Sequence, residues 1–320
     1  MSKHTIIGHA RQRAELASDL ESGNVTHAYL FAGAPHLGKM TVAHWFAREL
    51  LCDGKNATEK EEIIRQCDHL IHPDLLVLDQ LWIEDRCDDF DVIAKTTNVP
   101  QQHRAKAPTA KTDTISIDDV REIQSRVQET GNSKFRVCII RGIERMQEAA
   151  ANAFLKTLEE PPQGRVFLLT TDAPSSVIPT ILSRSRVLQF QRVSDKEINA
   201  LLKDSDEDDR RFILHLAQGA PGVAVRLAND PDALREERQM HEQAMRFWEN
   251  TSPLDRLLLL KPLFERGEES DRFLLHLSLA LRETTYTRAQ ERALMELTTG
   301  LKTNAHRQLM TQSFALRIEN

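Results

Sequence analysis

Short apolar runs alternate with amphipathic stretches along the N-terminal part of the chain. Each run has the length of a buried strand, and between the runs apolar residues recur at helical spacing, most clearly over residues 39–51 and 144–160. This alternation is typical of strand-helix units that build a parallel sheet, so the pattern predicts an α/β domain over residues 1–191. The predicted strands are residues 28–32, 74–79, 135–140, 165–171 and 186–190.

Two local signals place helix boundaries in this region. Ser116 and Asp119 have the spacing of a capping box, which predicts that a helix begins just after Ser116. Pro161 and Pro162 end the helix predicted over residues 144–160, because neither residue can donate the next backbone hydrogen bond.

Beyond residue 191 the strand pattern stops, and the chain consists of successive amphipathic helices. The segment from Gly219 to Gly222 interrupts a helical stretch and is expected to join two helices. We therefore predict two all-α domains, residues 192–230 and residues 231–320. Three of the helices have clear N-terminal signals: Ser194 with Glu197, Asp230 with Pro231, and Ser252 with Pro253.

Length and charge exclude several classes of protein. A chain of 320 residues can bury a large core without disulfides. Its 42 Lys and Arg residues against 48 Asp and Glu residues give a net charge of -6, so no overall positive field draws it onto a phosphate backbone. No apolar run approaches the roughly 18 residues of a membrane span, and the first residues lack the apolar stretch of a secretory signal. We expect a cytoplasmic protein without a membrane partner.

A polar segment of mixed charge separates the second predicted strand from the Ser116 helix. It is acidic over residues 84–91 and basic over residues 95–111. We interpret residues 80–113 as a mobile loop, because a mixed charge run is more often a solvated surface than a DNA contact.

Residues 33–40, called the phosphate loop below, follow a predicted strand and precede a predicted helix. The sequence Gly33-Ala-Pro-His-Leu-Gly38-Lys39-Met40 approaches the pattern G-x-x-x-x-G-K-[ST], whose backbone N–H groups and lysine surround phosphate oxygens. Met40 lacks the hydroxyl that ligates Mg²⁺, and Thr41 points about 100° away around the helix. An ordinary glycine turn before a helix would also fit the loop alone, but its context favours a degenerate phosphate loop. Gly33, Gly38, Lys39 and Thr41 are the candidate ATP-binding residues.

A second part of the hydrolytic apparatus is missing at the end of the third strand. Nucleotide hydrolases place an acidic residue there to hold the metal, whereas this chain has Arg141 followed by Gly142. An arginine repels a divalent cation, and a glycine offers no carboxylate to orient water. Glu144 could act as a displaced base, but we favour a helix-capping role for it. We therefore expect no useful ATP hydrolysis and no metal held by this chain.

Several motifs resemble the bacterial DNA polymerase III clamp-loader subunits of the AAA+ class, and most closely those of the delta-prime type. The resemblance is strongest over residues 151–162, Ala-Asn-Ala-Phe-Leu-Lys-Thr-Leu-Glu-Glu-Pro-Pro. Residues 115–122 and 179–185 resemble the same family, and weaker similarities lie at residues 6–9, 27–31 and 72–74 and at Asn304.

The resemblance implies an AAA+ module followed by a helical lid, residues 192–230, and a helical collar, residues 231–320, that joins a hetero-pentameric ring. The implied partners are gamma/tau motor subunits and a delta subunit and, through the complex, the sliding clamp and primed DNA. Delta-prime subunits are commonly hydrolysis-deficient stators, which agrees with the residues at positions 40 and 141, Met40 and Arg141. The cofactor expected is then ATP, bound residually and not hydrolysed. The resemblance implies no polymerase activity for this chain. The alternatives are an active DNA-stimulated ATPase motor of the gamma/tau type, using Thr41 and a displaced carboxylate, and an unrelated nucleotide-dependent regulator.

The same resemblance assigns a catalytic role to Arg184. The family's Ser-Arg-Cys motif presents an arginine finger to ATP bound by the adjacent motor subunit, and Ser183-Arg184-Ser185 is its counterpart, with serine in place of cysteine. A guanidinium is permanently charged and can bind two phosphate oxygens at once. Arg186 and Arg192 are nearby competitors for this role.

The chain departs from the family in its cysteines. Many relatives carry four cysteines in a zinc module after the phosphate-loop helix, but only Cys52 and Cys67 lie in that region here. His69 and His72 do not complete a usual zinc-ligand spacing, so we expect no zinc.

Residues 170–172, Thr-Thr-Asp, lie where the family has its first nucleotide sensor. A capping turn before Pro174 is an equal interpretation of these residues.

Overall fold

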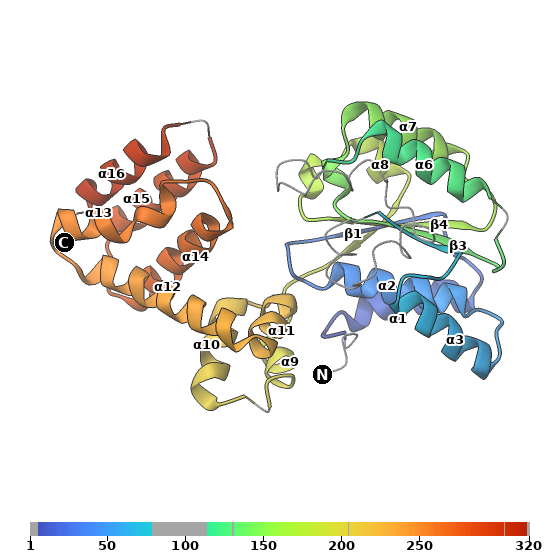
Figure 1. The fold of residues 1–320 in the computed structure, drawn as a ribbon, viewed down its shortest axis with the longest axis horizontal. Helices are drawn as coiled ribbons and strands as arrows, with labels where there is room; N and C mark the ends of the chain where they lie inside the picture. Colours follow the sequence, from blue (N-terminus) through green and yellow to red (C-terminus); the bar gives the residue numbers. More distant parts are fainter. Residues whose placement is uncertain (1–5, 79–113, 130, 204, 304, 319–320) are drawn as a thin grey trace. The chain divides into compact units, whose positions relative to one another are not determined.

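The computed structural model describes residues 6–78, 114–129, 131–203, 205–303 and 305–318. The predicted loop over residues 80–113 and the family-like Asn304 lie outside these residues. The chain divides into two compact units, Met1–Val225 and Arg226–Asn320, which are described separately (Figure 1). The sequence-based division at residues 191 and 230 stays a prediction.

The first unit contains a five-stranded parallel sheet in the order β2-β3-β4-β1-β5. Every strand coincides with a predicted one to within a residue or so at each end, and the predicted α/β fold is confirmed. The buried runs form strands because each apolar residue can face one of two covered sides of the sheet. The strands are β1 Ala28–Ala32, β2 Leu75–Leu78, β3 Arg136–Ile140, β4 Arg165–Thr171 and β5 Arg186–Gln189.

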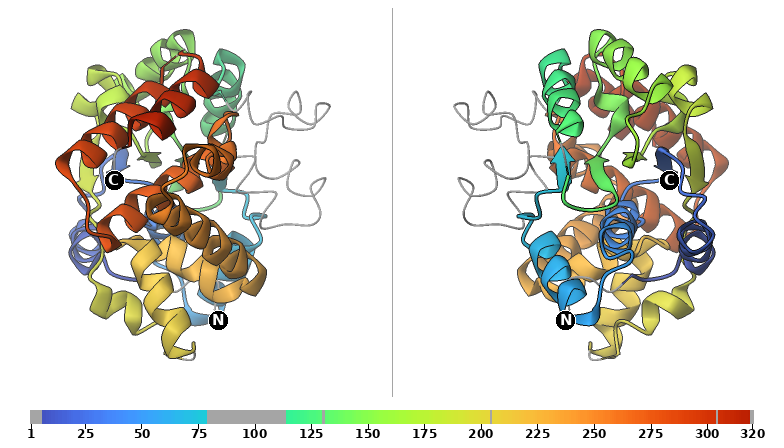
Figure 2. Two further views of the ribbon diagram at one scale, coloured as in Figure 1. Left: turned by 90° about the vertical axis from the view of Figure 1, so that its left-hand side faces the viewer. Right: turned by 90° about the vertical axis from the view of Figure 1, so that its right-hand side faces the viewer.

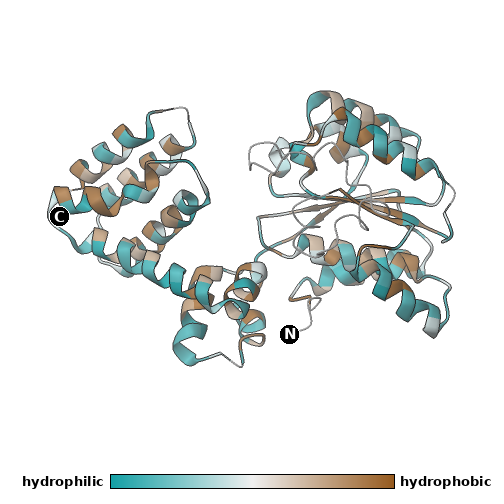
Figure 3. Ribbon diagram, in the orientation of Figure 1, coloured by the Kyte–Doolittle hydropathy of each residue, from teal (hydrophilic) through white to brown (hydrophobic). Residues whose placement is uncertain are grey.

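Helices cover both faces of the sheet, as Figure 1 and the right-hand view of Figure 2 show. Along β1, Tyr29 and Phe31 join one apolar cluster while Ala28 and Leu30 join the other, which is the two-residue alternation of a strand. Figure 3 shows the strands in the colours of apolar residues between these layers. One face is covered by α1 Ala10–Glu21, α2 Lys39–Leu51 and α3 Ala57–Asp68; the other is covered by α6 Ile117–Gln128, α7 Glu148–Glu159 and α8 Pro179–Ser183.

The helix predicted over residues 144–160 begins later than expected. Gly142, at φ 67°, starts a 3-10 turn, η2 Ile143–Arg145, and Met146 then forms a parallel bridge with Ile115. Because this bridge draws the backbone into an extended conformation, α7 starts only at Glu148. Its predicted end before the two prolines is confirmed. A second 3-10 turn, η3 Pro174–Ser176, follows β4.

The remaining chain is helical, as predicted, and the three expected capping signals are confirmed. Ser194 caps α9, Asp230 caps α12 and Ser252 caps α13, each through a side-chain oxygen that accepts from backbone N–H groups of the first turn. The helices are α9 Asp195–Asn199, α10 Glu207–Ala217 and α11 Pro221–Asn229, then α12 Pro231–Glu249, α13 Pro253–Leu259, η4 Lys261–Leu263, α14 Glu268–Glu283, α15 Arg288–Leu301 and α16 Arg307–Arg317. Among the described residues, no helix is both long and apolar enough to span a bilayer.

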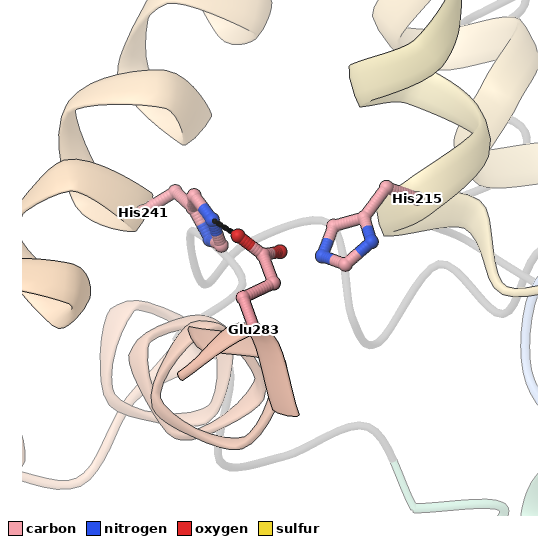
Figure 4. Close-up of side chains that lie close together, drawn as sticks. All are labelled: His215, His241 and Glu283. Atoms are coloured by element: carbon pink, nitrogen blue, oxygen red, sulfur yellow. Dashed lines mark hydrogen bonds and ion pairs between the residues drawn. The ribbon is translucent and has the colours of Figure 1, made fainter. Parts of the chain in front are cut away.

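The second unit has its own apolar core and a buried ionic network. Phe247 and Phe314 stack with ring centroids 5.5 Å apart at the centre of the core. Beside it, Glu237 accepts from His276 Nε2 at 2.7 Å. Burial alone raises the pKa of Glu237, but the His276 hydrogen bond, the Arg272 charge and further bonds outweigh it and lower the pKa to about 2. His241 extends the network, with its Nε2 3.3 Å from Oε2 of Glu283 (Figure 4).

Candidate phosphate loop and surface arginine

The phosphate loop connects the end of β1 to the start of α2, at the carboxyl end of the parallel strands. Gly33 N donates to Thr171 O at 3.2 Å. A side chain at residue 33 is excluded because its Cβ would lie 2.4 Å from the carbonyl oxygen of Phe190. Gly38 has φ 87° and caps α2, a conformation that suits glycine. The loop therefore has the backbone course that the sequence predicts.

The Lys39 side chain is buried among acceptors of the protein itself. Its Nζ donates to Gly33 O at 2.7 Å and to Ala34 O, and it lies 2.6 Å from Oδ1 of Asp172. Only 6% of Lys39 is exposed. The ammonium group thus makes its hydrogen bonds to acceptors of its own chain. A polyphosphate bound at this loop would have to replace one of these acceptors.

The residues around the loop fit a phosphate group but not a magnesium ion. Gly38 and Lys39 provide the glycine turn, helix N-terminus and cation that bind phosphate oxygens. Met40, however, packs partly buried against the core, and Arg141 is exposed at the end of β3. Thr41 lies half-buried one position further along α2. A hard cation prefers oxygen ligands, and neither Met40 nor Arg141 supplies one.

Glu144, the candidate displaced base, accepts a backbone hydrogen bond. Its Oε1 accepts from Asp172 N at 3.1 Å, so the carboxylate caps the turn after β4 rather than its own turn. This bond places Glu144 next to the residue that pairs with Lys39.

Residues 170–172 combine features of both interpretations that the sequence leaves open. Thr170 Oγ1 accepts from Gly142 N at 3.1 Å, and Thr171 Oγ1 accepts from Ala173 N at 3.1 Å, which is the capping turn. Asp172 faces the phosphate-loop lysine, as a nucleotide sensor would have to do.

The start of α11 packs directly on the phosphate loop. Gly222 N donates to the carbonyl oxygen of His36 at 2.8 Å, and a Cβ at residue 222 would lie 2.8 Å from the same oxygen. On the other side, His9 Nε2 lies 2.7 Å from Leu37 O, and burial lowers the pKa of His9. The loop is therefore held from two sides, by the backbone of Gly222 and by the side chain of His9.

Arg184 lies at the surface, immediately after α8. Its side chain is 35% exposed, and Nη2 donates to Oε1 of Glu159 at 2.8 Å. Nη1 donates to Thr180 O at 3.2 Å. The guanidinium is thus accessible and held in one orientation by α7 and α8.

The two competing arginines have structural partners. Arg186 forms an ion pair with Asp19, whose Oδ2 also accepts from the Tyr29 hydroxyl at 2.9 Å. Arg192 Nη1 donates to Gln218 O at 2.9 Å. The ion pair of Arg186 therefore links β5, the edge strand of the sheet, to α1. The hydrogen bond of Arg192 links the segment after β5 to the turn after α10.

The two cysteines considered for zinc are buried as free thiols. Cys52 and Cys67 belong to the same apolar cluster, and burial raises the pKa of Cys67 to about 12. His69 Nδ1 lies 2.8 Å from Arg65 O, and His72 Nδ1 accepts from Asp74 N at 3.1 Å. Packing and local hydrogen bonds account for all four side chains.

Sequence reasoning missed three contacts that shape these sites: Lys39 with Asp172, Glu159 with Arg184, and His36 with Gly222. Each joins residues far apart in the chain, so no spacing rule points to it. One signal was available for Glu159, because an acidic residue at the end of a predicted helix opposes the helix dipole and needs a cation nearby.

Known proteins resemble this chain at the level of sequence and fold. The family model described as DNA polymerase III, delta subunit, matches residues 8–194. A Haemophilus influenzae protein named DNA polymerase III subunit delta' is 27% identical over 260 residues, which is 79% of this chain and 68% of the relative. A Mycobacterium tuberculosis DNA polymerase III subunit gamma/tau is 27% identical over 201 residues.

The gamma/tau match is partial on the relative's side. It covers 62% of this chain but only 30% of the relative's length. A solved Thermotoga maritima structure, of a DNA polymerase III gamma subunit-related protein, has a TM-score of 0.57 at 17% identity and covers 94% of this chain and 97% of that one. This likeness shows the fold alone.

Proposed function

The chain belongs to the DNA polymerase III delta-subunit family of clamp-loader AAA+ subunits, and from this premise we propose that it is the non-hydrolysing stator of the loader. In this role it supplies Arg184 in trans to ATP bound by an adjacent gamma/tau motor subunit. Its other partners are a delta subunit and, through the assembled hetero-pentamer, the sliding clamp and primed DNA.

The accessible guanidinium of Arg184 carries the proposal. A finger must stay accessible until a neighbouring subunit arrives. Arg184 is 35% exposed and its partner Glu159 is 49% exposed, whereas Arg186 is paired with Asp19, whose side chain is only 11% exposed. A guanidinium placed on γ-phosphate oxygens stabilises the charge that develops during phosphoryl transfer.

The defects around the phosphate loop support a stator rather than a motor. Met40 and Arg141 replace the two magnesium-binding positions, and Lys39 is already paired with Asp172. Residual ATP binding through Gly33, Gly38 and Lys39 is compatible with these contacts only when Lys39 exchanges Asp172 for phosphate. We propose no hydrolytic step for this chain, because Met40 and Arg141 stand at the two positions that supply oxygen ligands in the magnesium-binding pattern.

ATP turnover by the reconstituted clamp loader tests the role of Arg184. We expect Arg184→Ala to leave the chain folded and assembled but to lower the kcat of the complex by 10³-fold or so, the order expected for loss of an arginine finger. Arg121→Ala is a matched control, since Arg121 is exposed on α6 and, within the described part of the chain, pairs with Asp118 three residues away. Full turnover in the Arg184→Ala complex would reject the proposal.

The gamma/tau relatives favour a second candidate function, an active motor subunit, because they match this chain at the same 27% identity as the delta' relative. The purified chain separates the two functions. ATP turnover in the presence of DNA and clamp that disappears in Lys39→Ala would support the motor, and its absence supports the stator.

A further inference from the structure

Glu159 occupies an electrostatically unfavourable position. It is the last residue of α7, where the helix dipole presents partial negative charge, and Glu160 follows it as the C-cap. Lys156 brings one positive charge to the last turn, but neither of the next two residues, Pro161 and Pro162, adds another. A carboxylate is expected here only if a cation faces it, and sites that depart from such local rules are often functional.

The cation that faces Glu159 is Arg184. Oε1 of Glu159 accepts from Arg184 Nη2 at 2.8 Å, although the two residues lie on different helices. Glu159 is 49% exposed and Arg184 35% exposed, so the pair is at the surface and adds little to folding stability. Its consequence is geometric, since a flexible arginine is confined to one orientation.

These contacts leave part of the guanidinium accessible. Nη2 donates to Glu159, and Nη1 donates to the carbonyl oxygen of Thr180 at 3.2 Å and to Ser183 Oγ at 3.5 Å. A guanidinium has five N–H donors in one plane. These three bonds fix the plane, while the other two donors can still reach an anion.

We propose that Glu159 is a positioning residue for Arg184: its carboxylate holds the guanidinium so that the remaining donors face the triphosphate of the neighbouring subunit. This inference rests on the proposed trans finger. Glu159, the first glutamate of the Leu-Glu-Glu-Pro-Pro segment, thereby pre-organises an arginine for a site that belongs to another chain. Because the arginine is already oriented, the entropic cost of forming the interfacial hydrogen bonds is lower.

Steady-state ATP turnover by the reconstituted loader, with clamp and primed DNA, tests this role. We expect Glu159→Ala to lower kcat about tenfold while the KM for ATP and the assembly of the complex are unchanged, a smaller loss than removal of the finger. Glu159→Gln should retain most of the activity, because an amide oxygen can accept the same hydrogen bond. Glu160→Ala is the matched control, since Glu160 is the adjacent exposed acid.

A double variant links the two residues. In an Arg184→Ala background, Glu159→Ala should cause no further loss, because the side chain that it positions is absent. A fall in kcat for Arg184→Ala together with wild-type kcat for Glu159→Ala would overturn the positioning role alone. No effect of Arg184→Ala would overturn the proposed function itself.

Three other results would also contradict the positioning role. An increase in kcat for Glu159→Ala would mean that the carboxylate competes with phosphate for Arg184. An equal loss in Glu159→Gln and Glu159→Ala would mean that charge, not orientation, matters. Failure of the Glu159→Ala chain to assemble would make the residue part of the subunit contact.

Discussion

The ammonium group of Lys39 lies 2.6 Å from the carboxylate of Asp172, and this pair closes the phosphate loop on the end of β4. Lys39 begins α2 and Asp172 directly follows β4, and their contact places a negative group where a nucleotide phosphate would bind. A phosphate must therefore displace Asp172 before Lys39 can hold it.

Neutralising Asp172 should increase the affinity of the chain for ATP. In Asp172→Asn the ion pair with Lys39 is lost. We expect the Kd for ATP to fall about fivefold, which corresponds to about 1 kcal/mol for an ion pair whose carboxylate is half-exposed. Isothermal titration calorimetry with ATP measures the change. Adding Lys39→Ala to Asp172→Asn should remove the gain, and an unchanged Kd in the single variant would show that the pair does not oppose binding.

Filling the contact between α11 and the phosphate loop should destabilise the first unit. In Gly222→Ala the new Cβ would lie 2.8 Å from the backbone oxygen of His36, which cannot rotate away, so we expect a loss of about 1 to 3 kcal/mol. Urea unfolding of the full chain measures it. Gly267→Ala is the matched control, because a Cβ there meets no atom within 4 Å. Equal stability of the two variants would contradict the proposed tight contact.

Stability of the second unit should depend on the ionisation of Glu237. Its pKa falls from about 4.5 in the unfolded chain to about 2 in the folded chain, so its contribution is fully present above pH 4.5 and is lost as the pH falls towards 2. The contribution at neutral pH is at most about 3 kcal/mol. Urea unfolding between pH 7 and pH 3, followed by tryptophan fluorescence to which Trp248 of the second unit contributes, should show a steeper loss in the native chain than in Glu237→Gln. Parallel curves would argue against the lowered pKa.

The local elements of this protein follow directly from residue patterns. The strand Ala28–Ala32 and the helix Lys39–Leu51 have the predicted bounds. A short unbroken apolar run suits a strand that is buried on both faces, and a helical apolar stripe suits a helix that packs on one side. The helix predicted from Glu144 was wrong at its start, because the Ile115–Met146 bridge is a long-range contact that overrides local propensity.

The candidate sites divide along the same line. Met40 and Arg141 can be recognised as departures from the magnesium-binding pattern because each part of the pattern is local: Met40 lies in the turn-helix segment after one strand, and Arg141 directly follows another. That Arg186 pairs with a nearly buried aspartate while Arg184 pairs with an exposed glutamate cannot be deduced from the chain, since both arginines belong to one short run of residues. The difference arises when α1 brings Asp19 against Arg186 and α7 brings Glu159 against Arg184.

Periodicity and capping thus specify the strands, the helices and the altered phosphate loop, because these depend on neighbours within a few residues. Which charged groups meet depends on the packing of distant segments, as Lys39 with Asp172 and Arg184 with Glu159 show. Electrostatic pairing acts over a few ångströms in space, and only the folded chain brings those atoms within that distance.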